Sequence, residues 1–222
     1  MRWITKTKKT CAVILATVMC FGMLITVPPR AAAEEEKYPY TIFASSDAEG
    51  AIMVNADNFC LNGSIATNGT IVSSGEMNIN GTKTEQADRS RMYIFQKIED
   101  TYFHQSQYDA YEEDYTLKEQ NINITTPMQV SGAVSLEGNI NLSTAMKALE
   151  HITISGEVKN TGDSIIFSKY GDITINTTNV NLSGLIYAPF GSVEITAQNL
   201  SLNNVIIIAE KVTITCPSVN AN

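Results

Sequence analysis

Short alternations of apolar and polar residues run through most of the chain. Ile173-Thr174-Ile175 and Val180-Asn181-Leu182 are two examples. Alternation with a period of two is typical of a strand that buries one face. Stretches rich in Asn, Ser and Gly separate these alternations, and Asn and Gly tolerate the left-handed backbone conformations of tight corners. The pattern therefore predicts many short strands joined by sharp turns.

The predicted strands recur with a fixed period. Residues 171–190 and 191–210 are adjacent copies of one 20-residue unit. Apolar residues return at equal offsets in the two copies: Ile173/Val193, Ile175/Ile195, Val180/Leu200, Leu182/Leu202, Leu185/Val205 and Tyr187/Ile207. Such a period is typical of a solenoid, whose coils are stable only when stacked. We predict an all-β fold, a single-stranded β-helix (β-solenoid) with about 20 residues per coil and a short α-helical insertion.

The solenoid is predicted to span residues 40–222 and to be interrupted at 83–121. Within the interruption, the apolar residues Met92, Phe95, Ile98 and Tyr102 recur at steps of three and four, which predicts an amphipathic helix over 91–103. Tyr108, Tyr111 and Tyr115 predict a second, shorter helical turn. The last partial coil ends at Asn222, where we expect an uncapped strand edge, and the chain could be part of a longer protein.

The third strand of each predicted coil, such as Leu185-Ile186-Tyr187, is apolar at both parities. A strand that is apolar on both faces is usually covered on both. Stacking 20 residues apart predicts an outer stripe of Ile166, Ile186 and Ile206, a candidate interaction surface. Either the predicted helix 91–103 or a partner protein covers it.

The N-terminus has the pattern of a signal peptide. Basic residues precede an apolar run over residues 11–27, and Ala31-Ala32-Ala33 offers a cleavage site before Glu34. We predict a signal peptide at 1–33, a lead-in at 34–39, and an exported protein at the cell surface or outside the cell. A retained anchor helix is the alternative. Cleavage leaves no predicted membrane span.

Charge excludes several classes of partner. The full chain carries 15 basic and 23 acidic residues, and removing residues 1–33 leaves 10 basic and 23 acidic, a net charge of −13. Nucleic acid is excluded because its binding depends on basic residues at the phosphates. Anionic polymers and membranes would be repelled as well.

Few residues offer chemistry. His104 and His151 have no Cys or His at metal-ligand spacing, and no Gly-x-Ser-x-Gly elbow is present. The acidic clusters lack the spacing of known Ca²⁺ loops, so no metal, cofactor or catalytic residue is assigned. After cleavage the cysteines are Cys60, at an outward strand position, and Cys216, at a corner; we favour two unpaired thiols.

The predicted outward positions form a mild polar surface. They are Thr153, Thr174, Glu194 and Thr213 on one strand of the coil, and Asn141, Asn181 and Ser201 on the next. A polysaccharide lyase or hydrolase needs acidic residues that converge on one face, which this pattern does not provide. A threonine ladder can indicate ice binding, but Glu194 interrupts this one. We predict that the protein is not an enzyme.

Several stretches resemble the β-solenoid modules of exported clostridial-type cell-surface proteins. These are SGLIYAP (183–189), Gly191, NLSLN (199–203) and IAEKVTI (208–214), while residues 38–47 and 56–63 resemble the opening of such modules. The resemblance covers nearly all of residues 38–220, carries no catalytic motif and implies a cell-envelope location. A looser similarity is to the polymer-forming bactofilin β-helices, which are cytoplasmic; the signal peptide argues against that role.

Three functional hypotheses follow. The first is a non-catalytic, exported structural or adhesive module of a bacterial cell envelope, with an envelope component or surface protein as partner. The second is a carbohydrate-binding or carbohydrate-cleaving β-helix, for which Tyr108, Tyr111 and Tyr115 are the candidate ligand-binding residues. The third is a β-helix that self-associates end to end through its terminal coil.

Overall fold

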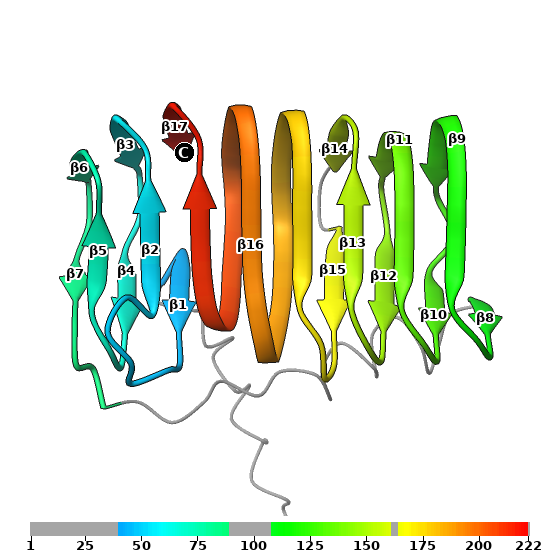
Figure 1. Ribbon diagram of the computed structural model, residues 1–222, viewed down its shortest axis with the longest axis horizontal. Coiled ribbons are helices and arrows are strands. Elements are labelled where there is room, and N and C mark those ends of the chain that lie inside the picture. The colour runs from blue at the N-terminus through cyan, green and yellow to red at the C-terminus, as the bar shows by residue number, and fades with distance from the viewer. Residues whose placement is uncertain (1–39, 89–107, 161–163, 222) are drawn as a thin grey trace, which may run out of the picture. The chain divides into compact units, whose positions relative to one another are not determined.

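The computed structural model describes residues 40–88, 108–160 and 164–221, which belong to one compact unit, Tyr38–Asn222. They form a parallel β-solenoid of about 7 turns with roughly 19 residues per coil (Figure 1). No helix is present within these three ranges. The predicted all-β solenoid is confirmed.

Within the described ranges, seventeen strands make up one sheet that is wound into the solenoid. In chain order they are β1 (Ile42–Ala44), β2 (Ile52–Asn55), β3 (Asn58–Leu61), β4 (Ile65–Thr67), β5 (Ile71–Ser73), β6 (Glu76–Ile79), β7 (Lys83–Thr84), β8 (Asp109–Tyr111), β9 (Tyr115–Ile124), β10 (Met128–Val130), β11 (Val134–Leu142), β12 (Ala145–Ala148), β13 (Ile152–Ser155), β14 (Val158–Asn160), β15 (Ile165–Ser168), β16 (Ile173–Thr215) and β17 (Ser218–Ala221). β16 is continuous through several corners, so its parts lie on all three faces.

The strands line up in three faces. The first face contains β13, β2, β5 and the first halves of β9 and β11, together with parts of β16. The second contains the last parts of β9 and β11, then β14, part of β16, β17, β3 and β6. The third contains β8, β10, β12, β15, part of β16, β1, β4 and β7. Every one of these pairings is parallel.

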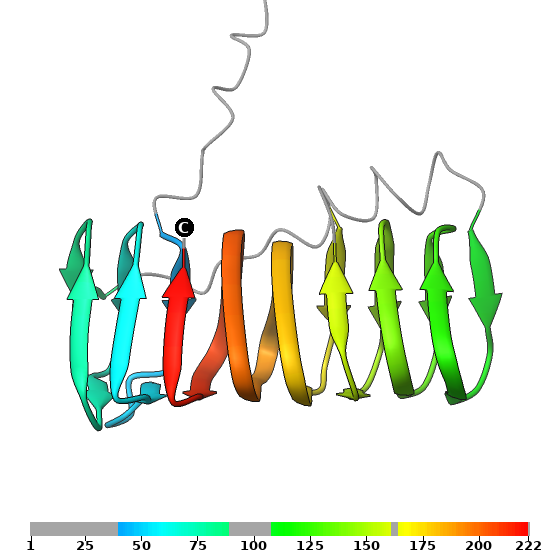
Figure 2. The ribbon, with the colours of Figure 1, turned by 90° about the horizontal axis from the view of Figure 1, so that it is seen from above.

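The coils do not stack in the order of the sequence. β17, the last strand, pairs with β16 on one side and with β3 on the other. On the first face Val212 pairs with Ile52, and on the third face Ile207 pairs with Ile42. The N-terminal strands therefore continue the stack beyond the C-terminal strand, as the step from red to blue and cyan shows in Figures 1 and 2.

The expected uncapped edge at the final coil is therefore wrong. Backbone N–H and C=O groups at an open edge need partners, and a second strand supplies them. Here the partner comes from the other end of the chain. Within the part of the chain that the structure describes, the strands paired on one side only are β8 and β9 at one end of the stack and β5, β6 and β7 at the other.

The predicted helical insertion at 83–121 is wrong over much of its length, because β7, β8 and most of β9 fall inside it. Tyr111 ends β8 and Tyr115 begins β9, so the predicted second helical turn is a strand corner. Tyr115 pairs with Val134, and both Tyr115 and Leu117 pack against the core. Tertiary pairing has overridden the local three- and four-residue spacing. The predicted helix 91–103 lies outside the described residues.

The interior of the solenoid is a continuous apolar core. Ile173, Val193 and Val212 are all fully buried within it, as the repeat predicts. The inward residues of β2, β3 and β4 belong to the same core, so the N-terminal strands share one interior with the rest. Burial of stacked apolar side chains is the main stabilising term for such a fold.

A second apolar cluster lies on the outer side of the third face. It contains Tyr40, Phe43, Ala66, Ala145, Ile165, Phe167, Tyr187 and Ile208. The Phe167 and Tyr187 rings are 5.1 Å apart, and both side chains are fully buried. The third face is thus apolar on both sides, as predicted.

The predicted composition of the outer stripe is wrong. Ile166 and Ile186 are fully buried in the inner core, while Ile206 packs against the outer cluster. The alternation of inward and outward side chains shifts by one residue between these coils. Tyr187 is in the outer cluster, whereas Ile207, 20 residues later, is in the inner core. The matches Leu185/Val205 and Tyr187/Ile207 are wrong for this reason, and the corner at the change contains Asn204, with φ 51°.

Candidate functional site

The described residues form a shallow groove on the second face, about 990 Å³ in volume. We call it the amide groove. It is lined by seven asparagines, Asn121, Asn123, Asn139, Asn141, Asn179, Asn181 and Asn199, and by Glu157, Lys159, Gln198, Ser201 and Pro217, with Ile140, Val158, Val180 and Leu200 at its floor. β9, β11, β14 and β16 supply the lining except for Glu157, which precedes β14, and Pro217, which follows β16. The groove therefore crosses several consecutive coils.

Alternation along each strand places the asparagines in the groove. On β11, Ile140 and Leu142 point into the core, and Asn139 and Asn141 therefore point outward. In-register pairing repeats this arrangement on β9, where Asn121 pairs with Asn139 and Asn123 with Asn141. Equivalent outward positions of successive coils thus form rows along the solenoid axis.

Hydrogen bonds between side chains hold these rows in order. Asn139 Nδ2 donates to Asn121 Oδ1 at 3.4 Å, and Asn141 Nδ2 donates to Asn123 Oδ1 at 3.3 Å. Farther along, Asn199 Nδ2 donates to Asn179 Oδ1 at 2.9 Å.

The rows include two charged residues at the middle of the groove. Asn179 Nδ2 donates to Glu157 Oε1 at 2.8 Å. Glu157 and Lys159 are the charged residues of the lining, and their charges are opposite. The lining therefore carries no net charge, whereas the whole chain has a net charge of −8.

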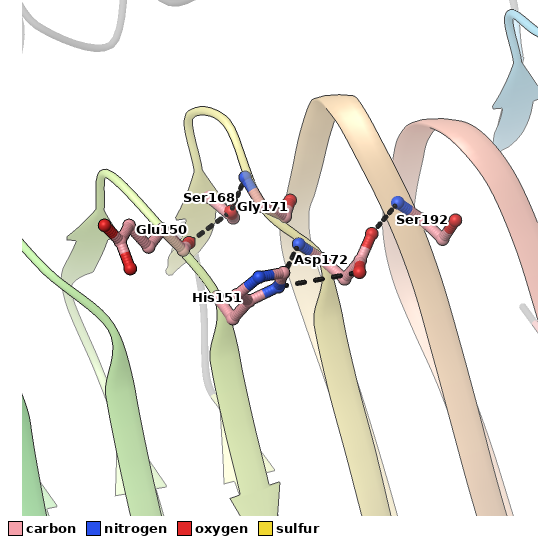
Figure 3. A network of polar contacts seen from close by, with 6 residues as sticks. All are labelled: Glu150, His151, Ser168, Gly171, Asp172 and Ser192. Carbon is pink, nitrogen blue, oxygen red and sulfur yellow. Dashed lines mark hydrogen bonds and ion pairs between the residues drawn. The ribbon is translucent and has the colours of Figure 1, made fainter.

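A polar network joins the corners of three coils between the third and first faces (Figure 3). The backbone N–H of Asp172 donates to His151 Nδ1 at 3.0 Å, so this nitrogen carries no proton in that arrangement. Asp172 Oδ2 lies 3.5 Å from the same nitrogen, and an ion pair there would need a protonated ring. The other carboxylate oxygen, Oδ1, accepts the Ser192 N–H at 2.7 Å.

The same corner contains a buried serine. The Ser168 hydroxyl lies 2.6 Å from the Glu150 carbonyl oxygen and 2.7 Å from the Gly171 carbonyl oxygen, and it accepts the Gly171 N–H at 3.0 Å. A Ser-His-Asp site requires a histidine that takes the serine proton and is itself oriented by the carboxylate. Here the serine faces backbone carbonyls, and His151 accepts a backbone N–H. The network therefore supports the corner and is not arranged for nucleophilic catalysis.

The described part of the chain contains no candidate metal site. No group of three or more His, Cys, Asp or Glu side chains there could hold a metal ion. His151 is 60% exposed at its side chain, as expected of a surface residue. His104 lies outside the described ranges.

The three predicted ligand-binding tyrosines do not lie together. Tyr111 and Tyr115 pack against the inner core at the end of the stack, with ring centroids 4.4 Å apart, whereas Tyr108 packs against the outer cluster. Desolvation by burial, followed by the charge and hydrogen bond of Tyr111, raises the pKa of Tyr115 above 10.0. None of the three lines the amide groove.

The threonine row on the first face is as irregular as the sequence predicts. Thr153 and Thr174 are outward, Glu194 interrupts the row, and Thr213 pairs with Met53. Met53 in turn pairs with Val72, so the row continues with apolar side chains. The first face is therefore a mixed surface.

The structure also reveals an exposed aromatic pair that the sequence analysis did not identify. Tyr170 is 60% exposed and Phe190 is 38% exposed, and their ring centroids are 6.0 Å apart on neighbouring coils. Lys169 Nζ lies 5.1 Å from the Tyr170 ring centroid. The 20-residue spacing of two corner aromatics was the signal that could have found them.

Both mature cysteines lie where the repeat places them. Cys60 is exposed on β3, and Cys216 is buried at a corner, where its thiol is 3.5 Å from the Gln198 carbonyl oxygen. No disulfide joins them.

A search for membrane-spanning helices, confined to the described ranges, finds none that is long and apolar enough. The predicted signal peptide at 1–33 and lead-in at 34–39 lie outside these ranges, so their assignment stays a prediction.

Comparisons with known proteins find similarity to two solved structures. No protein-family model matches the chain, and no curated protein matches it. The crystal structure of an ice binding protein from an Antarctic Biological Consortium is 12% identical, with a TM-score of 0.46, and the match covers 82% of this chain and 86% of that one. The ice-binding protein of the Antarctic ascomycete Antarctomyces psychrotrophicus is 14% identical, with a TM-score of 0.45, covering 82% of this chain and 94% of that one.

Proposed function

We propose that the chain is a non-catalytic, exported module that serves a structural or adhesive role at a bacterial cell envelope, with the amide groove as its binding surface. One observation carries the proposal: seven asparagines line a single groove across consecutive coils of a continuous solenoid. A fixed array of this kind can contact an extended partner at many points, while each contact stays weak.

A binding role fits the groove better than a catalytic one. Glycoside cleavage uses two carboxyl groups on either side of the bond to be broken. The lining offers one, Glu157, and that carboxylate accepts a hydrogen bond from Asn179. The remaining lining groups are amides, one ammonium, one hydroxyl and apolar atoms, none of which activates water.

Export and an envelope location rest on the sequence. Residues 1–33 have the charge and hydropathy pattern of a signal peptide. The resemblance to the solenoid modules of exported clostridial-type surface proteins supports the same location. An acidic, net negative surface favours solubility outside the cell.

Fractionation of cells that produce the protein tests the proposal. We expect the chain to begin at Glu34 and to be found with the envelope. Purified protein should also rebind to washed envelopes in a saturable manner, and rebinding should fall when Asn123 and Asn141 are both changed to alanine. Recovery of the uncleaved chain from the cytoplasm, or unsaturable rebinding, would overturn it.

End-to-end assembly is a weaker candidate than the sequence analysis allowed. Its premise was a bare edge at the final coil, and β3 occupies that edge. The strands that are paired on one side only, at the two ends of the stack, contain or adjoin acidic residues. These are Asp109 and Glu112 at one end and Glu76 and Glu85 at the other. Like charges at both ends disfavour stacking of two copies, and sedimentation at high concentration should give a monomer.

Ice binding, for which those two proteins are named, is not proposed for this chain. A threonine ladder can indicate ice binding, but Glu194, Met53 and Val72 interrupt the one on the first face. We expect no inhibition of ice recrystallisation by the purified protein. Clear inhibition would make the first face a functional surface.

A further inference from the structure

We infer that the amide groove binds an uncharged, hydroxyl-rich polysaccharide that lies along the solenoid axis. This inference rests on the proposed function and names the ligand class of its groove. Hydrogen-bonding capacity, the direction of the asparagine rows and the charge of the lining support it independently.

The amides have hydrogen-bonding capacity to spare. An asparagine side chain has two N–H donors and a carbonyl oxygen with two lone pairs. The bond from Asn141 to Asn123 uses one donor of the first and one lone pair of the second. All seven asparagines of the lining are exposed, so their remaining donors and acceptors are open to a ligand. Sugar hydroxyls both donate and accept, which makes them suitable partners.

The hydrogen bonds between the rows also hold the amides in place before any ligand binds. Asn199 is held by Asn179, and Asn179 by Glu157, at 2.9 and 2.8 Å. Side chains that are already ordered lose less conformational entropy on binding. Hydrogen bonds to an uncharged ligand, each contributing little, can therefore add up along the groove.

The direction of the rows selects a polymer. Neighbouring strands are about 4.7–4.9 Å apart, so equivalent outward positions repeat at that interval along the axis. Amides occupy these positions on β9, β11 and β16, and Glu157 and Lys159 occupy them in the coil of β14. A single sugar could reach only a few of these amides. An extended chain with hydroxyl groups along its whole length could contact every row.

Charge selects an uncharged polymer. Glu157 and Lys159 offset each other in the lining, and the chain as a whole carries 23 acidic and 15 basic residues. An anionic polymer would find no cluster of cations in the groove and would be repelled by the rest of the surface. A cationic polymer would find one carboxylate. The absence of aromatic side chains from the lining makes hydrogen bonding, and not ring stacking, the basis of recognition, so affinity should rise with polymer length.

Affinity gel electrophoresis of the purified protein tests the inference. The probes are neutral polysaccharides, namely a dextran, a mannan, a galactomannan, a xyloglucan and a mixed-linkage glucan, together with anionic polygalacturonate and hyaluronan. We expect at least one neutral polymer to retard the protein, and longer fractions of it to retard more strongly. We expect no retardation by either anionic polymer.

The chain offers a matched control for the groove. Asn80 Nδ2 donates to Asn62 Oδ1 at 3.1 Å, in the same kind of exposed amide pair as Asn141 and Asn123, but this pair does not line the groove. Changing Asn123 and Asn141 to alanine should weaken binding of the neutral polymer by about fivefold or more, the effect of losing one or two hydrogen bonds. Changing Asn62 and Asn80 to alanine should leave binding unchanged.

A measurement on the unaltered protein avoids dependence on the folding of variants. In nuclear magnetic resonance spectra, side-chain amide signals of the groove asparagines should shift with added neutral polymer, and those of Asn62 and Asn80 should not. The inference is overturned if no neutral polymer binds, if an anionic polymer binds more tightly, or if the shifts and the effect of the variants lie outside the groove. Envelope rebinding without polysaccharide binding would overturn the ligand class alone, whereas loss of both would remove the proposed function as well.

Discussion

At the scale of single residues, buried and exposed asparagine side chains have different roles in this fold. Asn160, at the end of β14, is 3% exposed, and its Nδ2 donates to the Ser183 carbonyl oxygen at 2.6 Å. Its Oδ1 accepts the Ser183 N–H, also at 2.6 Å. These two bonds satisfy both backbone groups of Ser183 at the corner before the third face. Asn141, by contrast, is exposed and makes one longer bond to another side chain.

Changing Asn160 to alanine should therefore destabilise the protein by about 2–4 kcal/mol, because it removes both hydrogen bonds to Ser183 and leaves the Ser183 N–H without its acceptor. Urea denaturation would measure the loss as a lower midpoint. The matched change Asn141→Ala should cost less than about 1 kcal/mol. Equal losses from the two variants would contradict the structural role given to Asn160.

Tyr115 makes the free energy of unfolding depend on pH in the alkaline range. Burial, then the neighbouring Tyr111, raises its pKa above 10.0, so the folded state holds the phenol proton more tightly than the unfolded state does. This contribution to stability is complete below pH 10.0 and is lost as the pH rises through the raised pKa. Tyr115→Phe should therefore lose less stability than the unaltered protein as the pH rises above about 10.

Urea denaturation at several alkaline pH values measures this difference. Tyr170→Phe, which removes a phenol from an exposed ring, is the control and should behave like the unaltered protein. A Tyr115→Phe profile that overlays the unaltered one would show that Tyr115 does not contribute.

At the scale of elements, the corners decide how closely one coil lies on the next. Gly191 and Gly171 occupy the same corner of successive coils. A Cβ atom on Gly191 would lie 2.1 Å from the Gly171 carbonyl oxygen. Since that oxygen is backbone, the contact cannot be relieved by turning a side chain, and the corner admits glycine only.

Gly191→Ala should therefore destabilise the protein by about 1–3 kcal/mol, the range for inserting an atom into a packed site. Thermal denaturation is a suitable measurement. Ser192→Ala is the neighbouring control, because it keeps the backbone N–H that Asp172 Oδ1 accepts, and it should change stability by less than about 0.5 kcal/mol. Tolerance of alanine at Gly191 would mean that the coils are farther apart there.

The elements also show what the sequence could and could not predict. Strand positions such as Ile173, Thr174 and Ile175 follow from local alternation, and their inward and outward placement is confirmed. Residues 115–121 were assigned to a helical insertion because tyrosine spacing and acidic residues hid their alternation. That error takes Asn121 out of the predicted coils, and Asn141 and Asn181 are predicted as outward residues but not as parts of a site.

At the scale of the whole molecule, the order of the coils is the feature that local patterns cannot contain. Every coil offers the same parallel backbone edge, with apolar residues inside, so any coil could stack on any other. The pairing of β17 with β3 joins the two ends of the sequence, and no periodicity records which coils are neighbours. This interlocking also removes the most obvious route to self-association, because the final strand is covered by its own chain.

A single engineered cysteine would test that order directly. Asn220 of β17 and Cys60 of β3 are register partners, and neighbouring strands at about 4.7–4.9 Å satisfy the Cα separation of a disulfide. Asn220→Cys should therefore form a disulfide with Cys60 under mild oxidation, detected by faster migration on a non-reducing gel and by peptide mapping. Closing so long a loop should stabilise the protein by up to about 5 kcal/mol in the chain-entropy account. Asn181→Cys, farther along the same face, should not cross-link; cross-linking of both variants, or of neither, would mean that the N-terminal strands do not stack on β17.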